Sequence, residues 1–398
     1  MFKLKNKYLN QLIIFSLILV SLYLFARIGY HGPAHKRAYL IYRLFANLGF
    51  PLILMVFGAL FLNKDKNLLH FDEKNIDSNA LENICDIDSN GLNSTEDSKS
   101  RSIENEDKGD NRKFLTPLKE LYSYLLPPFL FWALICIILK VLFLNIGDSP
   151  FEILIASIKL FFSSNWFIWI ILCSVLVIPI LNEFIKMEKK EGLNYFIILF
   201  VIASILWSLS KQFNFSLYYI DLVFFAEPFA YMALGYYLDN MIDMKNHRNL
   251  FLVSIIIFIV TFAIRSYLVF KGYVGWNKFF MEIFGSKISL SLDIFTIIEC
   301  STILLMFKSI NCNEIYNKIS NANIVNKILG YLGRNAYPLF LVLILITSIL
   351  TELKLSLPTN FIFYSIIMTI IFLVIGGILL FILDKIPYLN KIIGTRLP

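Results

Sequence analysis

Long apolar runs separated by short polar segments dominate the pattern along this chain. Residues 11–30 and 39–62 are each about the 20 residues that cross a hydrocarbon core of roughly 30 Å as a helix. Similar runs recur to the C-terminus, and together they predict ten membrane-spanning helices, near residues 11–30, 40–63, 120–145, 165–186, 194–212, 219–240, 250–270, 288–308, 335–352 and 359–383. The predicted fold class is therefore all-α, a polytopic membrane helix bundle.

Composition supports a membrane protein. The chain is 58% hydrophobic and only 16% charged, whereas soluble chains are roughly a quarter charged. The first apolar run follows Lys3, Lys5 and Lys7, as the apolar region of a signal peptide would. It is too long for that region and lacks a small-residue cleavage site, so we expect it to be the first span.

The short loops differ in their content of Lys and Arg, and this difference predicts an orientation. Because cytoplasmic loops carry an excess of these residues, the basic side should be cytoplasmic, with both termini inside, in the cell membrane. The residues behind this prediction are Lys3, Lys5, Lys7, Lys186, Lys189, Lys190, Lys245, Arg248, Lys308, Lys318, Lys327, Arg334, Lys385, Lys391 and Arg396. Lys36 and Arg37, in the first loop, run against the rule.

Residues 64–113 differ in kind from the rest of the chain. They hold 13 acidic against 8 basic residues and one aromatic residue, Phe71. Such a segment buries too little apolar area to offset its ordering entropy, so we expect a disordered cytoplasmic loop. The predicted organisation is two helices in residues 1–63, the acidic loop, and eight helices in residues 114–398, with the two helical parts forming one membrane domain.

The acidic loop also sharpens the charge balance. The loop carries −5, which leaves +12 on the remainder of a +7 chain. Anionic lipid headgroups explain such an excess, and so does a polyanionic substrate such as a CoA ester. Within the loop, Asp86, Asp88, Asn90, Gly91 and Asp97 follow the ligand spacing of a calcium loop. No amphipathic helix flanks them, and such a match arises easily by chance in a tract rich in Asp, Asn and Ser.

Several familiar site types are missing from the sequence. The five cysteines include no CxxC pair and no histidine at ligand spacing, so neither a disulfide framework nor a metal site is expected. The chain also has no phosphate-binding glycine loop and no serine-nucleophile elbow. ATP hydrolysis and zinc proteolysis are therefore not expected, nor is a nucleic-acid partner.

Ionisable residues inside the predicted spans are the default functional candidates, because each costs several kcal/mol unless it faces water, a partner or the bundle interior. These residues are Arg27, Arg43, Lys140, Asp221, Glu227, Arg265, Asp293 and Glu299. Lys140, Asp221 and Arg265 lie near span ends, where we expect their side chains to reach the interface.

Arg43, Glu227 and Glu299 lie deeper, and two interpretations remain open for them. Arg43 forms a structural ion pair with one of the carboxylates, or the three line a polar cavity for a substrate headgroup. His31 and His35 stand at the outer end of the first span. Histidine is suited to general-base catalysis near neutral pH, which makes His31 a candidate base, although an interfacial histidine is more often inert.

The order of several segments resembles the integral membrane acyltransferase 3 family. These segments are Asn47 to Leu62 with Pro51 and Gly58, Tyr124 to Trp132, Asn165 to Leu181, Phe225 to Tyr237, and Gly333 to Tyr337. The resemblance covers most of the chain outside residues 64–113.

The resemblance implies transfer of an acyl group, usually acetyl, from an acyl-CoA donor to a hydroxyl of a cell-surface glycan or lipid-linked sugar. His31 would be the catalytic base and Arg43 would stabilise the donor phosphates or the developing oxyanion. Acyl-CoA is then a substrate, with no tightly bound cofactor. The residues expected to bind substrate are Arg27, Asn47, Trp166, Glu227 and Glu299.

The sequence departs from the family at several usual positions. Asn10, Ile13 and Leu24 stand where members carry an acidic residue, an arginine and a histidine, and Phe57, Asn165 and Leu343 replace further usual Ser and His residues. Two alternatives therefore stay open. One is a non-catalytic, acyltransferase-like membrane subunit or sensor; the other is a glycan or lipid transporter, although no internal repeat is evident.

Overall fold

A computed structural model describes residues 7–30, 36–62, 125–139, 166–212, 222–242, 244, 246–274, 294–311, 323–353, 360–386 and 392–394. These residues are helical, apart from turns and connecting positions, and include no strand. The helices are α1 (Lys7–Gly29), α2 (Lys36–Ala46), α3 (Gly49–Phe61), an unlabelled helix over Leu125–Leu139, α6 (Trp166–Gln212), α7 (Leu222–Asn240), α8 (His247–Val274), α10 (Ile294–Asn311), α12 (Asn323–Arg334), α13 (Ala336–Leu353) and α14 (Phe361–Asp384). The all-α prediction is confirmed for this part of the chain.

Several of these helices have the length and composition of membrane spans. Five described helices meet this standard: Tyr8–Gly29, Ala38–Phe61, His247–Tyr267, Ile294–Asn311 and Phe361–Asp384. A sixth span results if the bent pair Ile328–Arg334 and Ala336–Thr351 crosses as one unit. The count of ten spans and the cytoplasmic placement of both termini stay predictions. The acidic segment 64–113 lies outside the described residues.

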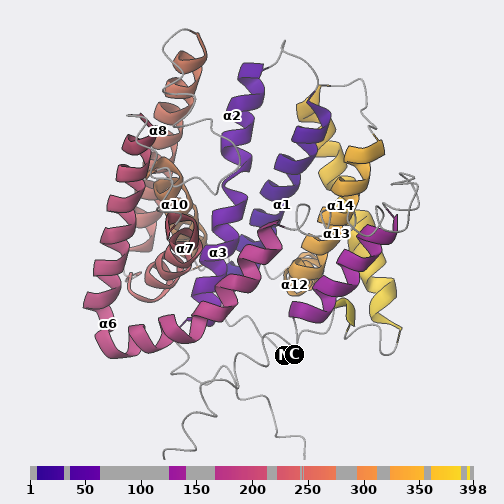
Figure 1. The fold of residues 1–398 in the computed structure, drawn as a ribbon, viewed down its shortest axis with the longest axis horizontal. Helices are drawn as coiled ribbons and strands as arrows, with labels where there is room; N and C mark the ends of the chain where they lie inside the picture. The colour runs from indigo at the N-terminus through magenta and orange to yellow at the C-terminus, as the bar shows by residue number, and fades with distance from the viewer. Residues whose placement is uncertain are drawn as a thin grey trace, which may run out of the picture.

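The predicted turn near Lys186, Lys189 and Lys190 is helical. We expected a turn between spans at residues 165–186 and 194–212, but helical backbone continues from Trp166 to Gln212 as α6, 47 residues long. The segment between them has no proline and is rich in Lys, Met and Glu, which are good helix formers, so the helix continues through it. Figure 1 shows α6 bending at its lower end, and its two halves run in different directions.

α1 is the central helix of the bundle. It contacts α3 and α10 on one side and α12, α13 and α14 on the other (Figure 1). α3 packs closely on α7, and α8 packs on α10. Because α1 and α3 contact helices from the second half of the chain, both halves form one packed bundle.

The outer helices α8 and α14 expose apolar rather than polar side chains. Ile256 and Ile259 on α8 and Phe363 and Ile370 on α14 are each more than half exposed. An apolar surface of this kind is stable in contact with lipid tails, because neither the side chains nor the tails form hydrogen bonds. These two faces are therefore suited to contact lipid.

Candidate functional site

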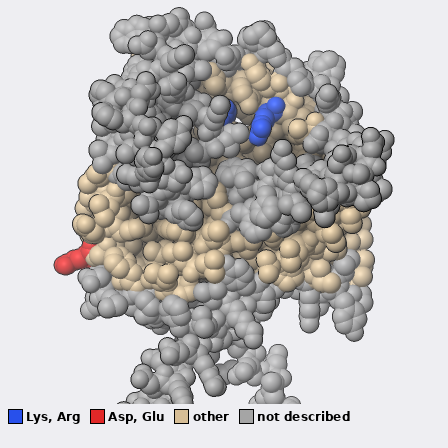
Figure 2. Space-filling view, in the orientation of Figure 1, with Lys and Arg blue, Asp and Glu red and all other residues tan. Residues whose placement is uncertain are grey.

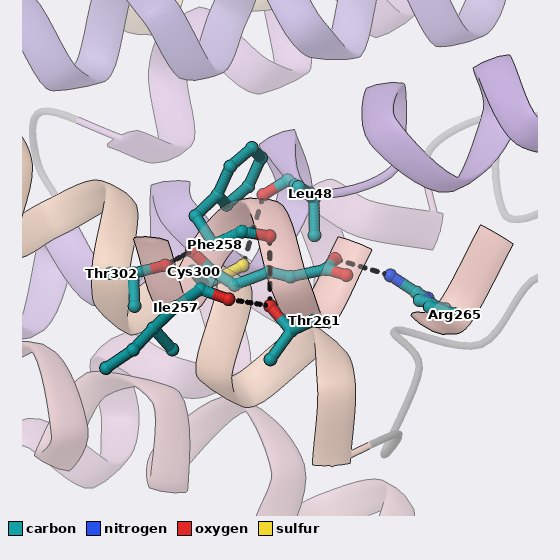
Figure 3. Close-up of polar contacts among 8 residues, drawn as sticks. Leu48, Ile257, Phe258, Thr261, Arg265, Cys300 and Thr302 are labelled. Carbon is teal, nitrogen blue, oxygen red and sulfur yellow. Dashed lines mark hydrogen bonds and ion pairs between the residues drawn. The ribbon is translucent and has the colours of Figure 1, made fainter. Parts of the chain in front are cut away.

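The described core contains one fully buried ion pair. The Nη1 atom of Arg265, on α8, lies 2.7 Å from the Oε2 atom of Glu299, on α10, and the two side chains are 2% and 0% exposed (Figure 3). The expectation that Arg265 reaches the interface is therefore wrong. An Arg43 pair with Glu299 is also not formed, because Glu299 pairs with Arg265.

Two threonine hydroxyls drawn beside this pair bond within their own helices. Thr302 donates to the backbone oxygen of Glu299 at 2.8 Å, and Thr261 donates to the backbone oxygens of Ile257 and Phe258 at 2.7 and 3.1 Å (Figure 3). Hydroxyls that bond to their own helix bury no unpaired donor. The two charged groups link α8 to α10.

Contacts extend from the ion pair to the junction between α2 and α3. Cys300, next to Glu299, donates its thiol to the backbone oxygen of Leu48 at 3.7 Å. Phe45, on α2, packs edge to face against Phe258 and Phe262 of α8. The helices that carry the buried pair therefore contact the segment that carries Arg43 and Asn47.

Arg27 and Arg43 form a second charged cluster at the end of α1 that leads into α2. Arg27 is in the last turn of α1 and Arg43 is in the last turn of α2. Both interact electrostatically with the hydroxyl of Tyr39, and the Arg43 guanidinium lies 5.9 Å from the ring centroid of Tyr23. The fold brings these two predicted site residues together.

No described carboxylate is within ion-pair distance of Arg27 or Arg43. Figure 2 shows Lys or Arg side chains on the upper part of the face it draws. Cations without a carboxylate partner are suited to bind an anion or to stabilise developing negative charge.

Aromatic rings pack against one another beside the two arginines. Tyr30 and Tyr39 stack with their centroids 4.1 Å apart, and Phe361, the first residue of α14, meets Tyr30, Tyr39 and Tyr42 edge to face. Tyr42 also shares a 2.6 Å hydrogen bond with Ser365. This aromatic cluster joins the ends of α1, α2 and α14.

The remaining predicted site residues are less completely described. His31 lies outside the described residues, but it directly follows Tyr30 in the sequence. Trp166 begins α6 and Glu227 belongs to α7, although their side chains lie outside the described part. Asn47 is at the α2–α3 junction, where its backbone N–H donates to the backbone oxygen of Arg43 at 2.9 Å.

At the other end of α1, Lys308 bonds to the end of a neighbouring helix. Its Nζ donates to the backbone oxygens of Leu238, Asp239 and Ile242 at 3.0, 2.6 and 3.0 Å. These carbonyls close the C-terminal end of α7, where a helix favours a cation. The Tyr8 hydroxyl donates to the Asp239 carboxylate, so α1, α7 and α10 are joined here.

The sequence comparison now identifies the family. A model of the acyltransferase domain of the acyltransferase 3 family matches residues 107–383, more than half of the chain. The chain belongs to the acyltransferase 3 family. The resemblance seen in the segment order is thereby confirmed. No curated protein and no solved structure matches the chain significantly.

The acyltransferase match includes only part of the candidate site. Arg265 and Glu299 fall inside residues 107–383, whereas Arg27, His31 and Arg43 precede them. The structure nevertheless packs α1 against α14, and α3 against α7, within the matched region. The arginine cluster is therefore attached directly to the acyltransferase domain.

Sequence reasoning missed the pairing of Arg265 with Glu299, although a signal for it exists. Two consecutive apolar helices carry, away from their ends, Arg265 and Glu299, which have opposite charge. Antiparallel neighbours with this arrangement place the two charges at similar depth, and charges within spans generally find a partner.

Proposed function

We propose that this acyltransferase 3 protein transfers an acyl group, most simply acetyl, from an acyl-CoA donor to a hydroxyl of a cell-surface glycan or lipid-linked sugar. The observation that supports this proposal is the placement of Arg27 and Arg43. Both interact electrostatically with the Tyr39 hydroxyl, and neither has a described carboxylate partner. They lie next to Tyr30, the residue that precedes His31 in the sequence. The family supports transferase chemistry in general. The donor and acceptor belong to the proposal.

In the proposed reaction, His31 accepts the proton of the acceptor hydroxyl as its oxygen bonds to the thioester carbonyl carbon. Arg43 stabilises the oxyanion that forms on the carbonyl oxygen. The carbon–sulfur bond then breaks, and His31 returns the proton to the leaving CoA thiolate. The products are an O-acyl ester and free CoA.

The other predicted residues take supporting roles in this proposal. Arg27 contributes a second positive charge for an anionic group of the substrate, and Asn47 keeps Arg43 in register at the helix junction. Trp166 and Glu227 are proposed to contact the acceptor. Glu299 acts through its pair with Arg265, which supports the α2–α3 junction from behind.

The test compares cells that lack the gene with cells carrying the wild type, His31→Ala, Arg43→Ala or the control Arg248→Ala. Base-labile acyl groups on extracted surface polysaccharides and lipids are quantified by mass spectrometry. Loss of a general base typically costs about 10²- to 10⁴-fold in rate, and loss of an oxyanion donor about 10²- to 10³-fold. We therefore expect acyl groups to disappear with the first two variants and to persist with the third, because Arg248 is exposed at the start of α8.

The outcomes separate the competing functions. Full acylation by His31→Ala, at equal protein level, would remove His31 from the mechanism. Unchanged acyl content in cells lacking the gene would favour the non-catalytic subunit or the transporter.

A further inference from the structure

α12 turns sharply away from the apolar helix that follows it. Its 12 residues span about 18 Å, too little to cross a hydrocarbon core of roughly 30 Å, whereas the 18 residues of α13 reach about 27 Å and nearly cross it alone. The segments Ile328–Arg334 and Ala336–Thr351 meet at 73°. With α13 crossing the membrane, α12 therefore runs close to the membrane plane, at the level where α13 begins.

The two sides of α12 differ in polarity. Positions three or four residues apart follow one side of a helix, and on α12 they hold Asn323, Lys327, Gly330 and Arg334. Arg334 is exposed, its Nε donates to the backbone oxygen of Gly330 at 3.1 Å, and a Cβ added to Gly330 would meet nothing within 4 Å. Ile328, on the apolar side, is 54% exposed. A helix with an open basic side and an exposed apolar side is typical of the membrane interface.

A third side of α12 fixes it to the bundle. A Cβ added to Gly333 would lie 2.7 Å from the Oδ1 atom of Asn10, on α1. The Tyr331 ring packs edge to face against Phe381, near the end of α14, with the centroids 6.3 Å apart. α12 is therefore held in place by α1 and α14, and Ile328, one turn before Tyr331, remains exposed beside this contact.

α14 ends beside α12 with a similar arrangement. Phe381 is 52% exposed, and the exposed Lys385, one turn later, places its Nζ 4.7 Å from the centroid of the Phe381 ring. Arg334 interacts electrostatically with the hydroxyl of Tyr331, the other ring of the pair. Two exposed apolar side chains thus adjoin two exposed cations. We call this region the α12–α14 surface; its residues are Ile328, Tyr331, Arg334, Phe381 and Lys385.

A carboxylate also borders this surface, so the charges have to be balanced. Asp384 ends α14 and interacts with the Tyr331 hydroxyl, as Arg334 does. Arg334 and Lys385 with Asp384 are two cations and one carboxylate, which leave a net charge of +1. α12 holds no acidic residue, and residues 385–398 hold three basic residues and no acidic one. The surface is therefore cationic, on the side that the loop charges predict to be cytoplasmic.

Apolar and cationic side chains at one place fit a lipid better than other ligands. A water-soluble anion would leave Ile328 and Phe381 exposed, and an apolar partner would cover Arg334 and Lys385 without neutralising them. A zwitterionic headgroup carries an ammonium group, which these cations repel. An anionic phospholipid satisfies both requirements, because its phosphate neutralises the cations and its acyl chains cover the apolar side chains.

We infer that an anionic phospholipid binds to the α12–α14 surface, with its phosphate at Arg334 and Lys385 and its acyl chains against Ile328 and Phe381. The bound lipid holds α12 against the end of α14 at the membrane interface. This inference is independent of the acyl donor and acceptor, because none of these residues belongs to the arginine cluster beside α2.

The test measures lipid binding to the purified full-length protein in detergent micelles by native mass spectrometry. Phosphatidylglycerol and phosphatidylcholine with identical acyl chains are titrated separately into wild type, Arg334→Gln and Lys385→Gln. A basic residue near an anionic lipid surface contributes about fivefold in affinity. We expect wild type to bind the first phosphatidylglycerol more tightly than phosphatidylcholine, and each variant to lose about fivefold for phosphatidylglycerol alone.

Further variants and ligands separate this surface from a general attraction to the basic side. Arg248→Gln removes an exposed cation at the start of α8 and should leave the affinity unchanged. Ile328→Ser keeps every charge and should weaken phosphatidylglycerol binding, because the acyl chains lose an apolar contact. Glycerol phosphate, which lacks acyl chains, should not displace the lipid. Thermal unfolding in lipid-free micelles should be unchanged in all four variants, because the replaced side chains are exposed.

Each of four results would overturn the inference. Equal affinity of wild type for the two lipids would show no anionic site, and an equal loss in Arg248→Gln would show attraction spread over the basic side. Displacement by glycerol phosphate would show a site for soluble anions. A dimer that Arg334→Gln dissociates, without a preference for phosphatidylglycerol, would assign the surface to a second copy of the chain.

Discussion

Gly58 on α3 and Gly235 on α7 allow these two helices to cross in direct backbone contact. A Cβ added to Gly58 would overlap the carbonyl group of Met232, and a Cβ added to Gly235 would overlap the carbonyl group of Met55. The two clashes are reciprocal, so the two glycines share one crossing point. Small residues give membrane helices the close packing that substitutes for a hydrophobic driving force.

Gly58→Ala and Gly235→Ala should each destabilise the bundle strongly. The new methyl group meets backbone, which cannot move aside without separating the helices. Overpacking usually costs about 1–3 kcal/mol, and we expect the upper end or more here. The measurement is thermal unfolding of the purified protein in mild detergent.

Gly330→Ala is the matched control for these two variants. It lies in α12, and its added Cβ meets nothing within 4 Å. Replacing a helical glycine with alanine in open space removes entropy from the unfolded chain, so stability should stay equal or rise by about 0.4–1 kcal/mol. Similar losses in all three variants would contradict the close crossing.

The sequence predicted both helices of this crossing but not their contact. Gly58 and Gly235 belong to segments that resemble the family, and helices lie where the two spans around them were predicted. Which span packs on which is not encoded in hydropathy, because lipid and protein interior are similarly apolar. The partner of each glycine therefore required the structure.

Arg265 and Glu299 should show strong energetic coupling. Arg265→Met alone leaves a buried carboxylate without its cation and should cost about 3–5 kcal/mol. Glu299→Leu alone leaves a buried guanidinium without its anion and should cost a similar amount. In Arg265→Met combined with Glu299→Leu no buried charge remains, so the double variant should recover most of the loss.

A double-mutant cycle on unfolding free energies measures this coupling. Recovery in the double variant means that the pair is not needed for stability as such, which is common for buried ion pairs. Acylation should stay impaired in that stable double variant, because the pair supports the junction that carries Arg43. Additive losses from the two single substitutions would contradict a direct interaction.

Arg265 shows why site residues are harder to predict than helices. It was placed at the interface from its distance to a span end, and its side chain points inward. α8 and α10 are apolar around most of their circumference, so no hydrophobic periodicity indicates their inner faces. Without that periodicity, the sequence gives the position of a residue along its helix but not whether its side chain points into the bundle or toward lipid.

Lys308→Met should loosen the end of the bundle where α7 stops. The ammonium group bonds to three terminal carbonyls of that region, and charge-assisted hydrogen bonds contribute about 1.5–3 kcal/mol. We expect a loss of stability of that order, with faster amide exchange over Leu238 to Ile242. Lys385→Met is the control, because its exposed ammonium lies over the Phe381 ring and bonds to no described helix end. An equal effect of the two substitutions would show that Lys308 acts only through its charge.

Tyr39→Ala should reduce acyl transfer far more than stability. The Tyr39 ring stacks on Tyr30, and Tyr30 precedes His31, so the stack fixes the chain next to the proposed base. A displacement of about 1 Å at a reacting group costs on the order of a hundredfold in rate.

Tyr39→Phe keeps the ring and should retain most activity, whereas Tyr195→Ala, at an exposed tyrosine of α6, should leave the rate unchanged. The rate of O-acylation by purified protein in vesicles, compared with thermal unfolding of the same samples, distinguishes the two effects. If Tyr39→Phe is as inactive as Tyr39→Ala, the required group is the hydroxyl that interacts with Arg27 and Arg43. The stacking of the Tyr39 ring on Tyr30 is then not what activity depends on.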